Sequence, residues 1–118
     1  MPKSIGVDII EINRIAKIIE TYGDQFLRKV FSETEIAYCN SKAKPAQHFA
    51  ARFAAKEAVT KAFGTGFTKN LLMKDVEVRN DKNGKPLIYF KGKRKKNILV
   101  SISHSDHYVV AFAILKKI

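Results

Sequence analysis

The stretch RFAAKEAVTKAFG, from Arg52 to Gly64, decides the fold of this chain. Alanine recurs along it, and most of its other residues also favour helices. Pro45 upstream suits the first turn of a helix, and Gly64 stands where a glycine cap would end one. We predict one long helix between these two residues. Its alanines keep it thin, so that a sheet or a ligand can approach closely.

The residues before this helix predict one strand and three short helices. Ser4–Ile10, SIGVDII, is a β-branched run typical of a strand. Apolar residues recur at helical spacing from 12 to 30, and Gly23 interrupts them, which indicates two helices. Ser32 followed by Glu35 is a capping box, which predicts a further short helix.

Beyond Gly64 the pattern changes to strands. DVEVRN (75–80) and PLIYFK (86–91) flank an Asn-Gly pair that favours a hairpin. NILVSIS (97–103) and YVVAFAIL (108–115) form a second pair. One strand, several helices with a long central one, and then antiparallel strands predict an α+β domain with an antiparallel sheet. With 118 residues, 46% of them apolar, we expect a single domain spanning 1–118.

No segment predicts membrane insertion or export. The apolar run from Tyr108 to Leu115 is too short to cross a bilayer, and the N-terminus lacks the apolar stretch of a secretory signal. We therefore expect a cytoplasmic protein. Cys39, the single cysteine, has no other ligands at metal-binding spacing and is predicted to be a small core residue.

The charge predicts an anionic partner. The chain has 22 Lys and Arg against 11 Asp and Glu, a net charge of +11. Charge alone does not choose between nucleic acid, a membrane surface, a phosphorylated small molecule and an acidic protein. KGKRKK (91–96) resembles a nucleic-acid-binding patch, but between two strands it is more simply a solvated turn.

Two carboxylates and a lysine are the candidates for chemistry. Asp8 interrupts an apolar strand, so it must either cap a turn or find a partner such as a metal ion. Glu57 and Lys61 share one helix face, and taken alone they would be a solvated ion pair. Gly64 and Gly66 follow in a segment whose backbone could lie against a phosphate. This set suits phosphate-ester transfer, because Mg²⁺ takes one or two protein carboxylates and a lysine stabilises the leaving phosphate.

The three histidines at 48, 104 and 107 lack a spacing suited to zinc. His104 lies among serines in SISHSDHY, but no nucleophile-elbow pattern accompanies it. It is predicted to be structural or a phosphate contact.

Four segments in order resemble one family: IGVDIIEINRI, RFAAKEAVTKAFGTG, NGKP and VSISHSDHY. Together they are similar to the short bacterial type of 4'-phosphopantetheinyl transferase, the holo-(acyl-carrier-protein) synthases, over essentially the whole chain. The resemblance implies the 4'-phosphopantetheinyl transferase fold and a role in fatty acid biosynthesis. The implied reaction transfers phosphopantetheine from coenzyme A to a serine of apo acyl carrier protein, releasing adenosine 3',5'-bisphosphate.

The resemblance also implies residue roles. Asp8 and Glu57 would hold Mg²⁺ together with the pyrophosphate of coenzyme A. Mn²⁺ could take the place of Mg²⁺. Glu57, directly or through a metal-bound water, would be the base for the carrier serine. Lys61 would neutralise the leaving bisphosphate, and in an alternative mechanism it would also protonate it. The implied coenzyme contacts, besides Lys61, are Lys44, Arg52, Gly64, Gly84, Lys85, Pro86 and His104.

The longer transferases of the superfamily carry a D-x-E motif, whereas the residue two positions after Asp8 is Ile10. A third protein carboxylate is therefore missing, as in the short type, and water would complete the magnesium shell. The longer enzymes resemble two fused copies of this unit, so the resemblance implies a homotrimer with sites between chains. An acidic carrier protein would dock on the basic residues Arg14, Lys17 and Arg28.

Two other classes of function stay open at this point. A small nucleic-acid-binding domain is favoured by the charge, although no binding motif or aromatic strand platform supports it, and no specific nucleic acid partner is predicted. A noncatalytic module that binds the carrier protein would keep the fold alone. The presence of Asp8, Glu57 and Lys61 together argues against that module.

Overall fold

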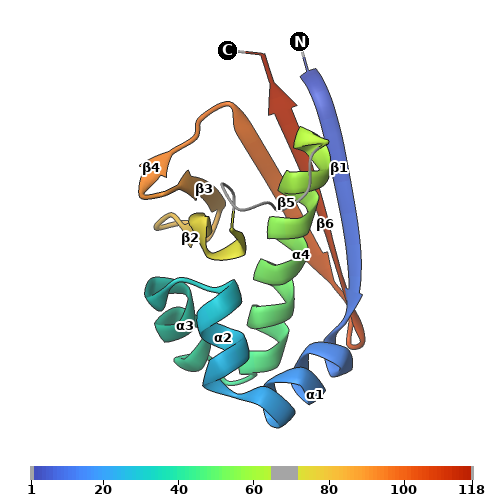
Figure 1. Ribbon diagram of the computed structural model, residues 1–118. Helices are drawn as coiled ribbons and strands as arrows, with labels where there is room; N and C mark the ends of the chain where they lie inside the picture. The colour runs from blue at the N-terminus through green and yellow to red at the C-terminus, as the bar shows by residue number, and fades with distance from the viewer. Residues whose placement is uncertain (1, 65–71, 118) are drawn as a thin grey trace.

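The computed structural model describes residues 2–64 and 72–117 (Figure 1). Its elements are, in chain order, β1 (Pro2–Glu11), α1 (Ile12–Tyr22), α2 (Asp24–Val30), α3 (Glu33–Asn40), α4 (Pro45–Phe63), the 3₁₀ turn η1 (Met73–Asp75), β2 (Val76–Asn80), β3 (Pro86–Phe90), β4 (Lys93–Arg94), β5 (Ile98–His104) and β6 (Tyr108–Lys116). The predicted α+β class, with a long central helix and strands on both sides of it in the sequence, is confirmed.

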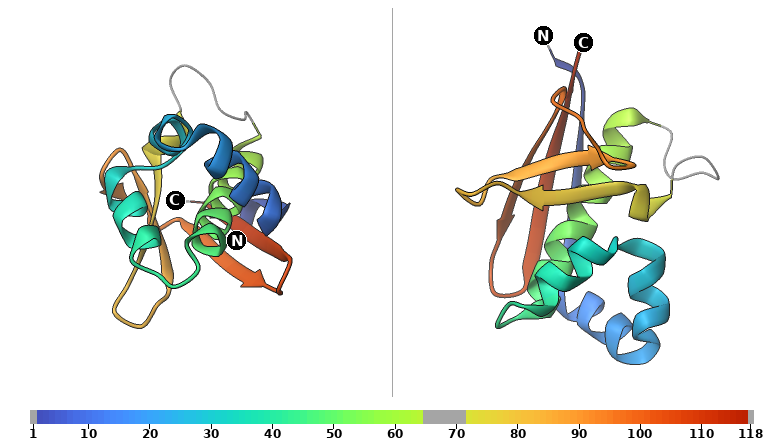
Figure 2. Two further views of the ribbon diagram at one scale, coloured as in Figure 1. Left: turned by 90° about the horizontal axis from the view of Figure 1, so that it is seen from below. Right: turned by 90° about the vertical axis from the view of Figure 1, so that its left-hand side faces the viewer.

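The strands form two antiparallel sheets, so the expectation of one sheet is wrong. One sheet has the order β1-β6-β5 and the other β2-β3-β4. The strands of the second sheet run across those of the first (Figure 2, right). The KGKRKK segment explains the separation, because it contributes the short strand β4 beside β3 before the chain turns into β5. The chain ends meet, since Pro2 lies opposite Lys116 in the β1–β6 pair.

Helix α4 lies directly against the first sheet (Figure 1). Ala54, Ala58 and Ala62 are buried there. Gly6 on β1 is so close that an added Cβ would meet the Ala58 carbonyl oxygen at 2.0 Å. Of the two roles left open for the alanines, close approach by the sheet is therefore the one the structure shows.

The predicted helix ends are confirmed. Pro45 opens α4, and Gly64 ends it in the left-handed conformation with φ of 81°. Gly23 separates α1 from α2 at φ of 54°. The capping box of α3 is complete, because Ser32 N–H donates to Glu35 Oε1 and Glu35 N–H donates to Ser32 Oγ. α1 and α3 pack against α4, whereas α2 packs against α1 and η1.

The outward face of the first sheet is apolar. Its alternate residues, which point away from α4, are exposed to 36–65%. They come from all three strands: Ile5, Val7, Ile9, Leu99, Tyr108, Phe112 and Ile114. Most apolar residues on a surface stand singly, whereas a continuous face of this kind is typical of an interaction surface.

Cys39 is completely buried in α3, as predicted for a core residue, and burial raises the pKa of its thiol to about 12. Within residues 2–64 and 72–117, no helix has the length and apolarity needed to span a bilayer.

Candidate active site

Asp8 and Lys61 meet where β1 borders α4. The strand alternation turns Asp8 toward the helix, on the same side as Gly6 and Ile10. Lys61 Nζ donates a hydrogen bond to Asp8 Oδ1 at 3.0 Å. The Asp8 side chain is only 15% exposed, whereas that of Lys61 is 54% exposed. Asp8 thus has the partner that its position in an apolar strand requires, and the turn-capping alternative is excluded.

Glu57 lies one helical turn before Lys61 and is partly buried. Burial raises the pKa of its carboxyl, the negative charge of Asp8 raises it further, and Lys61 opposes both. The structure therefore brings the three predicted residues together, with two carboxylates close enough to disfavour each other's charge. Like-charged groups in this arrangement are typical of functional sites.

The two carboxylates fit a magnesium ion. Mg²⁺ usually takes one or two protein carboxylates and obtains its other ligands from water and substrate phosphates. In the part of the chain that the structure describes, no cluster of three or more His, Cys, Asp or Glu could form a closed metal site. A cation here would also remove the repulsion that raises the pKa of Glu57.

A second group of basic residues surrounds Tyr38, and of these only Arg52 was a predicted coenzyme contact. The Arg52 guanidinium stacks on the Tyr38 ring at 3.9 Å, and Lys42 Nζ lies 4.7 Å from the same ring. His48 contacts the ring edge-on. Burial lowers the pKa of His48, and the nearby charges of Arg52, Lys42 and His104 lower it further. Such a concentration of positive charge favours an anion.

Arg52 is buried, with 4% exposure, and its Nη2 donates to Asn80 Oδ1 at 2.5 Å. Among the described residues, its Nε has no hydrogen-bond partner. Asn80 Nδ2 in turn donates to the Gly84 carbonyl at 2.9 Å. Arg52 is therefore connected to the hairpin that contains Gly84.

That hairpin places the remaining predicted coenzyme contacts at its tip. Asp81 Oδ1 accepts from the N–H groups of Asn83 and Lys85 at 2.8 and 2.9 Å, and Gly84 takes φ of 86°. Lys85 and Pro86 line a cavity of about 430 Å³ on the outward face of the first sheet, beside β5 and β6.

His104 ends β5, and its Nε2 lies 3.3 Å from Gln47 Nε2 in the first turn of α4. Lys44 precedes that turn as the N-cap residue. Both therefore lie at the N-terminal end of α4, whereas Lys61 and Gly64 lie at its C-terminal end. Gly66 falls outside the described residues.

The predicted residues thus form two groups on opposite sides of one chain. Asp8 is on the edge strand β1, while His104 is on the other edge strand β5, with β6 between them. Two strand spacings of about 4.8 Å separate these edges by roughly 10 Å. Arg52 precedes Glu57 by five residues, which turns it about 140° away around α4.

The predicted carrier surface is exposed but only partly apolar. Arg14 and Lys17 are exposed on α1, whereas Ile15 between them is fully buried and serves the core. Arg28 on α2 is exposed, and its Nη1 lies 3.9 Å from Glu33 Oε1.

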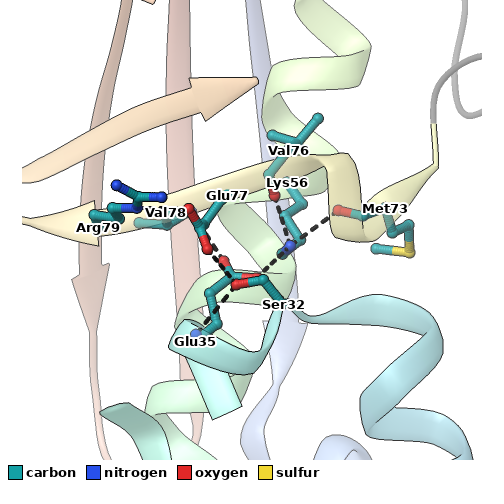
Figure 3. A network of polar contacts seen from close by, with 8 residues as sticks. All are labelled: Ser32, Glu35, Lys56, Met73, Val76, Glu77, Val78 and Arg79. Atoms are coloured by element: carbon teal, nitrogen blue, oxygen red, sulfur yellow. Dashed lines mark hydrogen bonds and ion pairs between the residues drawn. The ribbon is translucent and has the colours of Figure 1, made fainter. Parts of the chain in front are cut away.

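A buried polar network that the sequence did not predict lies on the opposite side of α4 from the first sheet (Figure 3). Lys56 Nζ donates to Glu35 Oε1 at 2.6 Å, to the Met73 carbonyl at 2.9 Å and to the Val76 carbonyl at 2.6 Å. Lys56 and Glu35 are fully buried. Burial lowers the pKa of Lys56, and the charge and hydrogen bond of Glu35 oppose that change.

One sequence feature pointed toward this network. Glu35 belongs to the capping box of α3, and its second carboxylate oxygen can accept a hydrogen bond from another segment. The Gly6 contact also had a signal, since a glycine inside a strand often marks close approach of another backbone. Neither signal identified the partner. The bond from Arg52 to Asn80 had no signal in the sequence.

Comparison with known proteins identifies the family of the chain. Residues 4–113 match the model of the 4'-phosphopantetheinyl transferase superfamily, so the chain belongs to that family. It is 48% identical to the holo-(acyl-carrier-protein) synthase of Protochlamydia amoebophila, over 97% of this chain and 98% of that one. It is 49% identical to the synthase of Thermodesulfovibrio yellowstonii, over 98% and 99% of the two chains.

A solved holo-(acyl-carrier-protein) synthase from Bacillus anthracis, in complex with CoA (3',5'-ADP), superimposes with a TM-score of 0.86 at 37% identity. The match covers 100% of this chain and 99% of that one. Within its superfamily, the chain is an enzyme of the holo-(acyl-carrier-protein) synthase kind. The two other classes of function, a nucleic-acid-binding domain and a noncatalytic module, are thereby set aside.

Proposed function

We propose that this enzyme transfers the 4'-phosphopantetheine group of coenzyme A to a serine of apo acyl carrier protein and releases adenosine 3',5'-bisphosphate, with Mg²⁺ as cofactor. The observation that carries the proposal is the convergence of Asp8, Glu57 and Lys61 at one border of α4. The similarity to holo-(acyl-carrier-protein) synthases, and the CoA (3',5'-ADP) bound to the Bacillus anthracis protein, support it. We place the reaction in cytoplasmic fatty acid biosynthesis, as the resemblance implies.

Glu57 is the proposed base. Burial is the main cause of its raised pKa, and it makes the Glu57 carboxylate a better proton acceptor than an exposed carboxylate. The carrier serine loses its proton to a Glu57 carboxylate oxygen as its Oγ bonds to the phosphorus that carries pantetheine. The bond from that phosphorus to the bridging oxygen breaks, and its electron pair stays on adenosine 3',5'-bisphosphate.

Lys61 stabilises the charge that develops on the leaving bisphosphate. The Lys61 side chain is 54% exposed, which leaves it accessible to a substrate, while the bond to Asp8 fixes its position. Asp8 and Glu57 would hold the magnesium ion. When bound, Mg²⁺ would neutralise negative charge on the carboxylates and on the pyrophosphate.

The positive group around Tyr38 is the proposed site for the coenzyme nucleotide and its 3'-phosphate. Lys44, Arg52 and His104 would face the nucleotide, and Gly84, Lys85 and Pro86 would lie along it. The support is the positive charge that Arg52 and Lys42 bring to the Tyr38 ring and the fixed shape of the hairpin.

We also propose that three copies assemble through the apolar outward face of the first sheet. The catalytic group and the nucleotide group lie at opposite edges of that sheet in one chain, an arrangement that suits a site shared between two neighbouring chains. The cavity lined by Lys85, Pro86 and Phe112 joins the hairpin to the apolar face. A second copy is therefore the occupant that also completes the site.

The acidic carrier protein would dock on α1 and α2 through Arg14, Lys17 and Arg28. Their exposure and the net charge of +11 support this assignment.

The test is direct. The enzyme is mixed with apo acyl carrier protein, coenzyme A and Mg²⁺, and the carrier is weighed by mass spectrometry. We expect the added mass of phosphopantetheine and equimolar adenosine 3',5'-bisphosphate. No adduct, with folded enzyme and a carrier that another transferase can modify, would refute the proposed reaction.

A further inference from the structure

We propose that the buried pair of Lys56 and Glu35 is a positioning device for the catalytic face of α4. This inference rests on the proposed function, because it assigns Lys56 and Glu35 an effect on Glu57 and Lys61. Neither residue touches the substrate in this scheme. Lys56 fixes where Glu57 lies relative to Asp8.

The network joins four separate segments at one point. Lys56 comes from α4, Glu35 from α3, the Met73 carbonyl from η1 and the Val76 carbonyl from β2 (Figure 3). The three acceptors match the three N–H donors of one ammonium group. Each bond comes from a different direction, so together they fix both the axial position and the rotation of α4 at this residue.

Glu35 is fixed equally well. Its Oε1 also accepts from Ser32 N–H at 2.9 Å, and its Oε2 accepts from Val78 N–H at 2.9 Å. Ser32 Oγ donates in addition to Glu77 Oε2, and Glu77 Oε1 accepts from Arg79 Nε at 2.5 Å. The anchor for Lys56 is thus part of the second sheet and of the α3 cap, and it cannot move alone.

The position of Lys56 on α4 explains why it would affect catalysis. At 100° per residue, it lies about 160° around the helix from Ala58, which packs on the first sheet. Two opposite faces therefore hold α4: backbone contact with Gly6 on one and the Lys56 bonds on the other. Glu57 is the next residue and lies between the two faces, so the direction of its side chain follows the orientation of the helix.

A small rotation would displace the Glu57 carboxylate considerably. The carboxylate lies roughly 6 Å from the helix axis, so a 10° rotation moves it by about 1 Å. Misplacement of a reacting group by about 1 Å can lower the rate about 100-fold.

Stability alone gives a poor explanation of the pair. Desolvation of two buried charges usually cancels their attraction, and apolar replacements of similar volume are often neutral or stabilising. A lysine and a glutamate, both 0% exposed, therefore suggest a role in fixing one arrangement of α4.

The experiment uses the double variant Glu35→Leu/Lys56→Met, which removes both charges and keeps their volumes. Urea unfolding measures stability, and the carrier assay measures kcat and the KM for coenzyme A. We expect an unfolding midpoint at or above that of the wild type, a kcat about 100-fold lower and a KM changed less than fivefold. The matched control is Leu115→Ala, a core substitution in β6 that loses stability; it should keep kcat at 15 °C.

A stable double variant with kcat within threefold of the wild type overturns the inference, because the pair would then serve the fold alone. If the double variant does not fold, Ser32→Ala decides. It removes the hydroxyl that donates to Glu77 and accepts from Glu35 N–H, and it leaves the buried charges in place. We expect a three- to tenfold lower kcat in the folded variant, and an unchanged kcat overturns the inference. A wild type that modifies no carrier would instead refute the proposed function.

Discussion

Replacement of Gly6 by alanine tests whether contact between β1 and α4 sets the catalytic geometry. The added Cβ would lie 2.0 Å from the Ala58 carbonyl oxygen and 2.6 Å from the Ala62 nitrogen. Both are backbone atoms, so β1 must move away. Ordinary contacts begin at 3.4 Å, which requires a shift of about 1.4 Å. Asp8 is two residues further along the same strand face and would move with it.

If β1 shifts as a unit, the distance from Lys61 Nζ to Asp8 Oδ1 grows from 3.0 Å to about 4.4 Å, beyond hydrogen bonding. Overpacking of this kind costs about 1–3 kcal/mol of unfolding free energy. The displacement should lower the rate of carrier modification about 100-fold. Urea unfolding followed by circular dichroism measures the first effect, and mass spectrometry of the carrier measures the second.

The control is Ile98→Val, a core substitution in β5 with a similar cost of about 0.5–1.5 kcal/mol. It should keep full activity at temperatures where it is folded. A folded Gly6→Ala enzyme with kcat within threefold of the wild type would refute the reasoning, because the contact would then not control Asp8.

Three further substitutions test the other assignments. Glu57→Gln should abolish carrier modification and, in EDTA at pH 7, raise the Tm. The folded pKa of Glu57 is raised, so the wild type loses stability as the pH rises through that value, and the gain should shrink at lower pH; a lower Tm for the variant in EDTA would contradict this. Phe112→Glu, on the apolar sheet face, should reduce the mass in light scattering from three times 13.3 kDa to a single protomer; a wild type that is already monomeric would refute the trimer. Arg14→Glu should raise the KM for the acidic carrier roughly tenfold at low salt and much less at high salt, because salt screens surface charges; Lys116→Glu is the matched control, and an equal effect of both would exclude specific docking.

Much of the fold follows from local signals in the sequence. Pro45 and Gly64 bound α4, Gly23 separates two helices, and Ser32 with Glu35 caps a third, because each of these effects acts within one turn of the chain. The split into two sheets did not follow. Strand pairing depends on contacts between residues distant in the chain, and the KGKRKK segment carried no signal of which sheet it would join.

In the candidate site, too, local features could be predicted from the sequence and long-range contacts could not. Glu57 and Lys61 could be paired from their spacing on one helix, and the Asp8 carboxylate was conspicuous in an apolar strand. Their convergence depends on β1 packing against α4, which the sequence expresses only through Gly6 and the small alanines. Lys56 illustrates what sequence spacing misses: it is the neighbour of Glu57, yet the helix turns it about 100° away, where it is fully buried.

Contacts on two faces of α4 hold Asp8 and Glu57 close together. Asp8 and Glu57 repel each other in the absence of a cation, and that repulsion favours separation of β1 from α4. Backbone packing at Gly6 resists the separation on the sheet side, and the four-segment anchor at Lys56 resists rotation on the other side. A pair of carboxylates kept close by two independent restraints is prepared for a divalent cation before one arrives. The proposed cation would bind more favourably there, because the fold has already opposed the repulsion between the two carboxylates.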